Sequence, residues 1–285
     1  MAHGLYPPCL VAVRRPSCAV SWLVSLLAVQ VGRVDKVVTA SNRFSSGRPC
    51  MSAPAEGVST WTNRSSDSQL PHHLGSLSMY FATRFVPDAR REGVWRHLAS
   101  YLKRWLPAEG ALLDLGAGYA DLANAAPCAR RVAFDLRPDL GDYTATGVEA
   151  EIGDVTDLSR FADATFDAVF ASNLLEHLDW PQLERCVDEV VRVLKPGGNF
   201  IAVQPNFRLN PGRYFDDFTH RTIFTDESLP DFLASRGLAP EHCEARFLPL
   251  TMKSRLSFGH RLVPLYLRLP WRPLAGQMLV VARHT

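Results

Sequence analysis

The sequence predicts an α/β fold in which a mostly parallel sheet carries helices on both faces. From about residue 76 onward, short apolar runs alternate with stretches whose apolar residues recur at helical spacing. This alternation is typical of repeated strand–helix–strand units, which build parallel sheets. The 285 residues are 47% hydrophobic and 21% charged. These are globular values, so they exclude wholesale disorder, collagen and coiled coil.

The first predicted element is a helix within residues 87–106, where Val94, Leu98 and Leu102 share one face. Apolar runs predict strands at residues 111–115, 131–135, 148–152, 167–171 and 200–204, with helices between them at 121–128, 158–162 and 181–194. The Lys-Pro-Gly-Gly run at 195–198 carries the signals that end a helix. A helix capped by Thr225 and two strands, near 243–248 and 277–282, complete the chain.

Residues 1–75 differ from the rest of the chain. An apolar run at 19–31 follows two arginines, as in a secretory signal, but it is shorter than the roughly 20 residues that span a bilayer. Residues 41–75 have the composition of a linker. Three interpretations stay open: a signal or anchor, a disordered extension, and an over-long gene model whose true start is Met51 or Met79. We expect the functional domain to occupy residues 76–285.

Charge and cysteine content exclude two classes of protein. The chain has 31 basic and 29 acidic residues, a formal net charge of +2, so no nucleic-acid partner is expected. Its six cysteines contain no C-x-x-C pair. The sequence therefore predicts neither a disulfide scaffold nor a structural zinc site.

Carboxylates and glycines follow the predicted strands at the edge where such sheets bind ligands. Asp114 precedes two glycines, Gly116 and Gly118, which allow a sharp turn and a close approach to a ligand. Asp135 ends the second strand, where an acidic side chain accepts hydrogen bonds from ribose hydroxyls. Asp154 follows the third strand, where a carboxylate can accept from an adenine amine. These features predict a nucleoside site.

Two classes of nucleoside ligand fit such a site. A dinucleotide site prefers a third glycine, at the position that Asp121 occupies, and a carboxylate at a helix start repels a pyrophosphate. Asp121 is also a favourable charge for the helix dipole. Asp114 beside the glycines favours a ligand with an amino group and a positive centre. S-adenosyl-L-methionine has both and carries no phosphate.

The motifs together resemble those of class I S-adenosylmethionine-dependent methyltransferases, in the branch that includes the ubiquinone-biosynthesis type. The resemblance covers about residues 80–285 and rests on Asp114-Leu-Gly-Ala-Gly118, Asp135, Gly153-Asp154, the run from Phe166 to His177, and Leu194-Lys-Pro-Gly-Gly198. It implies a Rossmann-like, seven-stranded, mostly parallel sheet with an antiparallel last strand and helices on both faces. Ala120 departs from the pattern, since many members carry a third glycine there. We expect a slight change in helix packing and intact binding.

The resemblance also assigns roles within the cofactor site. Gly116 and Gly118 would line the methionine part of S-adenosyl-L-methionine, and Asp114 would hold its ammonium group. Asp135 would bind the ribose and Asp154 the adenine. Ser172 and Asn173, just past the fourth strand, would flank the methyl group.

Glu176 and His177 follow the same strand and are the predicted catalytic residues, because a base assists methyl transfer to a hydroxyl. A purely structural role for the pair in shaping the loop stays open. No metal site is assigned, although Asn173, Glu176, His177 and His220 could bind a hard cation weakly. The residues after the fourth strand lack the Pro-Pro-aromatic run that is typical of enzymes acting on base amino groups.

Two segments lie where acceptors normally bind. Residues 204–225 mix aromatic and polar side chains, among which Arg208, Arg213 and His220 are the predicted substrate contacts. Residues 252–274 are basic, aromatic and leucine-rich, which is typical of a packed lid or of peripheral membrane contact.

Both segments are similar to those of bacterial methyltransferases from surface-polysaccharide gene clusters. That resemblance implies a saccharide oxygen as acceptor, either free or on a lipid carrier, with a small phenolic acceptor as the alternative. We expect a cytoplasmic enzyme, because the cofactor is made and kept there. Two alternatives remain: a degenerate cofactor-binding scaffold, and a nicotinamide-dependent oxidoreductase, which Asp121 disfavours.

Overall fold

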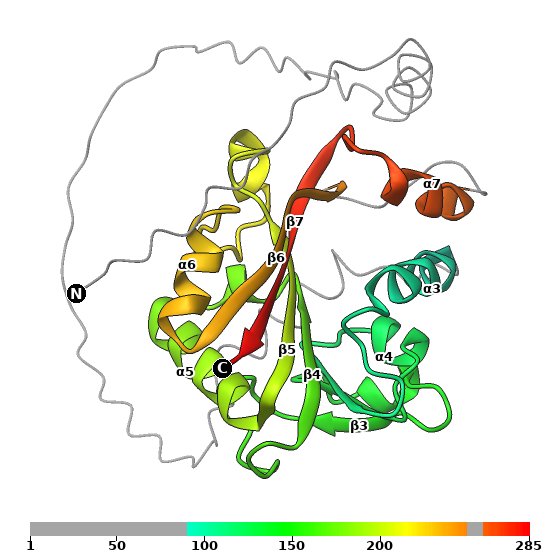
Figure 1. The fold of residues 1–285 in the computed structure, drawn as a ribbon, viewed down its shortest axis with the longest axis vertical. Coiled ribbons are helices and arrows are strands. Elements are labelled where there is room, and N and C mark those ends of the chain that lie inside the picture. Colours follow the sequence, from blue (N-terminus) through cyan, green and yellow to red (C-terminus); the bar gives the residue numbers. More distant parts are fainter. Residues whose placement is uncertain (1–89, 250–258) are drawn as a thin grey trace, which may run out of the picture. The chain divides into compact units, whose positions relative to one another are not determined.

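A computed structural model describes residues 90–249 and 259–285, and Figure 1 shows their arrangement around one sheet. The seven strands lie in the order β3-β2-β1-β4-β5-β7-β6. They are β1 Ala111–Leu115, β2 Arg130–Asp135, β3 Glu149–Ile152, β4 Phe166–Ser172, β5 Leu194–Pro205, β6 Leu238–Pro249 and β7 Ala275–His284. The pairs among β1 to β5 are parallel, and β7 runs antiparallel to both of its neighbours. The predicted fold class is confirmed.

Helices cover both faces of this sheet. They are α3 Arg90–Leu102, α4 Asp121–Ala125, α5 Trp180–Val193, α6 Ser228–Ser235 and α7 Val263–Arg268, with short 3₁₀ turns η1 Leu140–Tyr143, η2 Leu175–His177, η3 Pro211–Asp216 and η4 Gly259–Leu262. One apolar core joins the sheet to α5 and α6, and a second joins it to α3, α4 and α7. Alternate side chains of β1 enter the two cores, Leu113 the first and Leu112 the second.

The longest helix, α5, has the start and stop that its sequence predicts. Oδ1 of Asp179 accepts from the amide of Gln182 at 3.0 Å, and the Gln182 side chain accepts from the amide of Asp179 at 3.1 Å, which is a capping box. The helix ends at Val193. Strand β5 starts directly at Leu194, with a register shift against β4 that accommodates the glycine-containing run.

The predicted helix at 158–162 is wrong, because this stretch forms turns. Leu158 and Phe161 are buried as the pattern suggests. However, the Arg192 guanidinium of α5 donates to the carbonyls of both residues, at 2.9 and 2.8 Å. The amide of Leu158 donates to Glu189 at 2.7 Å. Side chains of α5 therefore satisfy backbone groups that a helix would satisfy internally.

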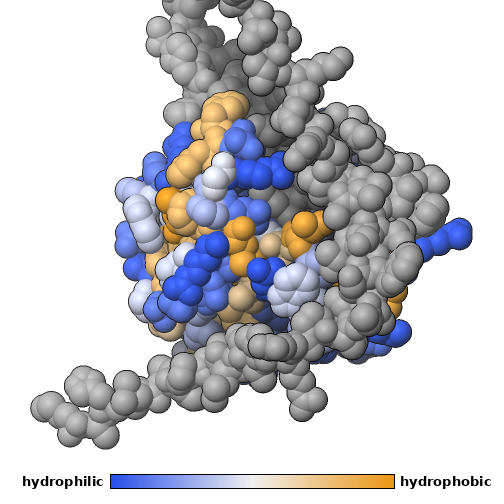
Figure 2. All heavy atoms as spheres, turned by 90° about the horizontal axis from the view of Figure 1, so that it is seen from above, coloured by the Kyte–Doolittle hydropathy of each residue, from blue (hydrophilic) through white to orange (hydrophobic). Residues whose placement is uncertain are grey.

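The helix predicted from Thr225 is present as α6 but begins three residues later, at Ser228. Thr225 still caps it, because its Oγ1 accepts from the amide of Ser228 at 3.1 Å. On the face seen in Figure 2, hydrophobic and hydrophilic residues are interspersed over the described domain. Within residues 90–249 and 259–285, no helix has the length and apolar character needed to cross a membrane. The predicted extension, residues 1–75, and residues 250–258 lie outside the described residues.

Candidate active site

The order of the strands brings the predicted carboxylates to one edge of the sheet. Strand β1 lies between β2 and β4, so the strand order reverses beside it, which is where ligands bind in such sheets. Leu115 pairs with Phe134, and Asp135 pairs with Ile152. Asp114 and Asp135 therefore lie at the carboxyl ends of β1 and β2, and Asp154 follows the neighbouring strand β3 by two residues. The positions of these three carboxylates at the ends of predicted strands had indicated that they lie at the same edge of the sheet.

The glycine loop after β1 is folded against β2. The amides of Gly116 and Ala117 both donate to the carbonyl of Phe134, at 2.9 and 3.1 Å. Gly116 has φ +69°, and a Cβ atom there would lie 2.9 Å from Cδ1 of Leu174. Both the left-handed backbone and the close approach of Leu174 require glycine. Ala120 also has a left-handed φ of 54°, which costs about 1–2 kcal/mol for a residue with a Cβ atom.

Asp135 links the glycine loop to the end of β2. Its Oδ2 accepts from the amide of Gly118 at 2.8 Å, and its Oδ1 accepts from the amide of Arg137 at 3.0 Å. Each carboxylate oxygen offers a second acceptor site, so these bonds leave capacity for ligand hydroxyls. Burial raises the pKa of Asp135, and the two backbone amides oppose that rise.

Asp114 is only 3% exposed, and its Oδ2 accepts from the amide of Ala123 at 3.0 Å. Burial raises its pKa to about 8, and the charges of Asp121 and Asp135 add to the rise. A carboxylate in this position is stabilised by a cationic ligand group. The buried acidic side chain therefore fits a ligand that brings an ammonium or sulfonium centre.

Asp121 has a partner that the sequence did not reveal. Nε and Nη2 of Arg91 donate to its Oδ2 at 3.0 and 2.5 Å. This pairing offsets part of the negative charge on which the argument against a pyrophosphate rests. The remaining argument is that three acidic side chains, Asp114, Asp135 and Asp154, are predicted to line the site. In their ionised form they match the donor groups of S-adenosylmethionine and would repel a phosphate.

The remaining predicted cofactor contacts are exposed or half-buried. Oδ1 of Asp154 accepts from both the amide and the hydroxyl of Thr156, at 2.9 and 2.8 Å. Asn173 adopts φ +49°, and its side-chain amide donates to the Ser172 hydroxyl at 3.1 Å. Its Oδ1 accepts from Gln277 of β7 at 3.0 Å. Gln277 thus fixes Asn173 from a strand that lies 104 residues away along the chain.

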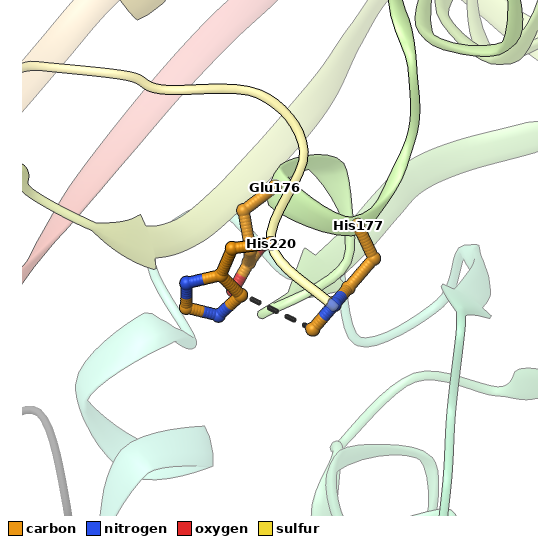
Figure 3. A group of neighbouring side chains, drawn as sticks. All are labelled: Glu176, His177 and His220. Atoms are coloured by element: carbon orange, nitrogen blue, oxygen red, sulfur yellow. Dashed lines mark ion pairs between the residues drawn. The ribbon is translucent and has the colours of Figure 1, made fainter. Parts of the chain in front are cut away.

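A second group gathers beside η2, where Glu176, His177 and His220 point toward one another (Figure 3). One ligand atom from each lies within 4.8 Å of the other two. The carbonyl of Glu176 accepts from the amides of Arg221 and Thr222, at 2.7 and 3.1 Å. These two bonds bring segment 204–225, and with it His220, onto η2.

Burial moves both titratable groups of η2 away from their usual pKa. Glu176 is 1% exposed, and burial together with the charge of Asp217 raises its pKa to about 8. Burial and the neighbouring His220 lower the pKa of His177 to about 4. His177 is therefore a neutral imidazole at physiological pH. Perturbed groups of this kind are typical of functional sites.

Two residues near His177 were not predicted from the sequence. The Thr219 hydroxyl lies 2.9 Å from Nδ1 of His177 and donates to Oδ1 of Asp217 at 2.5 Å. Nothing in the local pattern marks Asp217 or Thr219, because their contact with His177 depends on how segment 204–225 folds back.

The predicted substrate contacts separate into two groups. His220 joins the cluster at η2. Arg208 instead forms a two-pronged ion pair with Glu227, and Arg213 lies 3.6 Å from Asp216. Both arginines are exposed. Their role as substrate contacts stays a prediction.

Segment 252–274 is described from residue 259 onward. Arg272 is buried, donates to the carbonyl of Leu267 at 2.7 Å and pairs with Glu244, so it holds the segment on the domain. Leu265 and Trp271 are exposed. The expected peripheral membrane contact stays a prediction.

Comparison with known proteins agrees with this geometry. Residues 113–202 match a protein family described as Methyltransferase domain. A malonyl-[acyl-carrier protein] O-methyltransferase of Methylococcus capsulatus is 28% identical over 217 residues, 70% of this chain and 76% of the relative. A demethylmenaquinone methyltransferase of Leptospira interrogans is 38% identical over 72 residues, 25% of this chain and 28% of that relative.

Among solved structures, a SAM-dependent methyltransferase of Archaeoglobus fulgidus has a similar fold. Its TM-score is 0.52 at 17% identity, over 73% of this chain and 99% of that chain. The strand order, the glycine loop with its carboxylates and the family match lead to one conclusion. The described domain has the fold of class I methyltransferases, and the chain is a methyltransferase that uses S-adenosylmethionine as its cofactor.

Proposed function

We propose that this methyltransferase acts on an oxygen atom of a small-molecule or saccharide acceptor that binds between η2 and segment 204–225. The observation that carries the proposal is the position of His177. It follows β4 beside the predicted methyl site, and its Nε2 lies 4.0 Å from Oε1 of Glu176. A neutral imidazole there offers a lone pair to an acceptor proton.

The hydrogen bonds around His177 define which nitrogen carries that lone pair. The Asp217 carboxylate can only accept, so the Thr219 hydroxyl donates its single proton to it. The Thr219 oxygen then accepts from Nδ1–H of His177. This chain of donors places the imidazole proton on Nδ1 and leaves Nε2 as the acceptor, directed toward Glu176 and His220.

The chemistry needs alignment and removal of one proton. The bound cofactor supplies a methyl group that its sulfonium already activates. Asp114 and Asp135 hold the ammonium and the ribose in the account proposed here, and the glycine loop fixes their separation. An acceptor O–H would give its proton to Nε2 of His177 while its oxygen takes the methyl group. The cofactor would leave as a neutral thioether, and the proton on His177 would account for the charge.

Two further observations support an oxygen acceptor. The Methylococcus relative that aligns over 217 residues is named an O-methyltransferase. Segment 204–225 also combines the exposed rings of Phe215 and Phe218 with polar side chains. Aromatic faces beside polar groups suit a ring-shaped acceptor, whether a sugar or a phenol.

Methyl transfer from labelled cofactor to three acceptor probes tests the proposal: malonyl-coenzyme A, a uronic-acid oligosaccharide and a hydroquinone. We expect at least one product, with the label on oxygen. Where the labelled oxygen is a hydroxyl, His177→Ala should lower turnover by about 10²-fold or more and leave cofactor affinity within about twofold. A carboxylate acceptor has already lost its proton at neutral pH, so its methylation should depend less on His177. His242→Ala, a histidine outside the cluster, is the control. A label on nitrogen or carbon would contradict the proposal, and equal loss of binding and turnover in His177→Ala would assign that residue a structural role.

A further inference from the structure

The carboxyl of Glu176 is buried, with the side chain 1% exposed. Among the residues that the structure describes, no residue other than Glu176 itself, through its own backbone amide, donates a hydrogen bond to either carboxyl oxygen. Burying such a group without a partner costs free energy. A buried carboxyl that lacks a donor from another residue points to a ligand that binds the carboxyl oxygens.

The surroundings of this carboxyl restrict what that ligand is. Nε2 of His177 faces it at 4.0 Å, and the rings of His177 and His220 lie 5.0 Å apart between centroids (Figure 3). The three side chains offer one oxygen and two imidazole nitrogens, all within 4.8 Å. A set of two histidines and one carboxylate binds divalent transition metals such as zinc or ferrous iron.

The groups behind His177 prepare it for this role. A histidine that binds a metal donates its other ring N–H to a carboxylate, carbonyl or similar acceptor, which fixes its tautomer. The Asp217–Thr219 pair does this from the Nδ1 side, at 2.5 and 2.9 Å. It leaves the Nε2 lone pair on the side of Glu176.

We propose that Glu176, His177 and His220 form a site for one divalent transition-metal ion at the acceptor side of the methyltransferase. Ligand atoms that share such an ion lie about 3–3.5 Å apart, given bonds of about 2.0–2.2 Å. Ligand atoms that lie as far as 4.8 Å apart would therefore move closer by about 1.3–1.8 Å when the ion binds. From the sequence no metal is assigned here, although these three residues together with Asn173 are named as weak ligands that could bind a hard cation. In the structure, Oδ1 of Asn173 accepts from Gln277 instead.

Metal binding at this site does not depend on the proposed function, but its role does. A bound ion lowers the pKa of a hydroxyl that it contacts, so an acceptor oxygen would lose its proton more readily. With the ion bound, the Nε2 lone pair of His177 holds the ion and no longer takes the proton. The proton of the metal-bound acceptor hydroxyl would instead pass to bulk solvent, and the resulting oxyanion would take the methyl group.

Titration of the full chain with Co²⁺, followed by the visible absorption of the ion, tests the site without acceptor or cofactor. We expect one saturable site in the wild-type protein. Glu176→Gln keeps the size of the side chain, and His220→Asn keeps a polar but smaller side chain. Each should weaken Co²⁺ binding about tenfold or more. Thr219→Val removes the group that orients His177 and should weaken binding by about tenfold.

His242→Asn is the matched control, because His242 also lies beside a glutamate, with its Nε2 2.7 Å from Glu244, but outside the cluster. It should bind Co²⁺ as the wild type does. Because a variant can fail to fold, each is also titrated with S-adenosylhomocysteine, which should bind unchanged. Equal Co²⁺ affinity in the wild type and in both folded cluster variants would overturn the inference, as would the absence of a saturable site.

Activity then separates this inference from the proposed function. Oxygen methylation that persists at full rate after chelation would end the catalytic role of the metal and leave the proposed function standing. Co²⁺ binding that depends on Glu176, together with a product methylated on nitrogen, would support the metal site and contradict the proposed function.

Discussion

The amide of Gly118 donates a 2.8 Å hydrogen bond to Oδ2 of Asp135, so the carboxylate that is predicted to bind the ribose also shapes the glycine loop. Sequence separation hides this relationship, because the two residues belong to different strand–helix units. It joins the first strand's loop to the second strand's end. Loss of the carboxylate is therefore expected to disturb both the ligand contact and the shape of the loop.

Asp135→Ala should weaken binding of S-adenosylmethionine about tenfold or more, because charge-assisted hydrogen bonds contribute roughly 1.5–3 kcal/mol. Calorimetric titration of the full chain measures the change. Asp157→Ala is the control, since Asp157 is exposed and accepts from the Ser159 amide at 3.0 Å, beyond the predicted adenine contact. Unchanged affinity in Asp135→Ala would remove this residue from the site.

Gly116→Ala and Gly197→Ala form a matched pair. Both glycines have a left-handed backbone, with φ of +69° and +77°, so each substitution should cost about 1–2 kcal/mol of stability. Only at Gly116 does the added Cβ meet another side chain, that of Leu174; around Gly197 nothing described lies within 4 Å. Cofactor binding should weaken in Gly116→Ala alone. Equal binding in the two variants would show that the loop does not approach the ligand.

Asp114 should make cofactor binding depend on pH. Its pKa is raised to about 8 by burial, so it is mostly protonated at neutral pH before the ligand binds. An ammonium beside it lowers that pKa, and binding then releases a proton between the lowered pKa and pH 8. Affinity should therefore rise with pH, by up to about tenfold per unit.

Calorimetry between pH 6 and 7, in buffers of different ionisation enthalpy, counts the protons released by the wild type. The ligand's own ammonium keeps its proton in this range. Asp114→Asn should abolish the release. Proton uptake on binding, or release that persists in the variant, would contradict the assignment of Asp114 to the ammonium.

Glu244 should make stability fall in acid. Burial alone would raise its pKa, but hydrogen bonds from His242, Tyr101 and Arg272 hold the pKa at about 2. A folded-state pKa below the ordinary 4.5 gives stability that is present above pH 5 and is lost as pH falls toward 2. The contribution is on the order of 3 kcal/mol. Urea unfolding at pH 7 and pH 3.5 should show this loss in the wild type. Glu244→Gln should flatten it, and an equally steep pH dependence in the variant would assign the loss to other carboxylates.

The strands and the cofactor site could be predicted because both depend on local pattern. A buried parallel strand is a short apolar run, and parallel strands end at the same edge, so Asp114 and Asp135 converge without any knowledge of side-chain packing. The helix predicted at 158–162 is wrong because long-range contacts decide the structure there. Its apolar spacing is helical, but Arg192 from a distant helix takes over its carbonyls.

The acceptor side could be predicted only in part. Glu176 and His177 follow a strand and were found from that position. His220 arrives through two backbone bonds to the Glu176 carbonyl, and Thr219 reaches His177 through the same fold of the segment. No local periodicity encodes such contacts. The pairing of Arg208 with Glu227 likewise depends on packing between a loop and a helix start.

Calorimetric titration of the full chain with S-adenosylmethionine, S-adenosylhomocysteine and NAD⁺ tests the central claim most directly. The acidic side chains of Asp114, Asp135 and Asp154 predict micromolar binding of both sulfur nucleosides and no binding of NAD⁺. Binding of NAD⁺, or a folded protein that binds neither sulfur nucleoside, would contradict it.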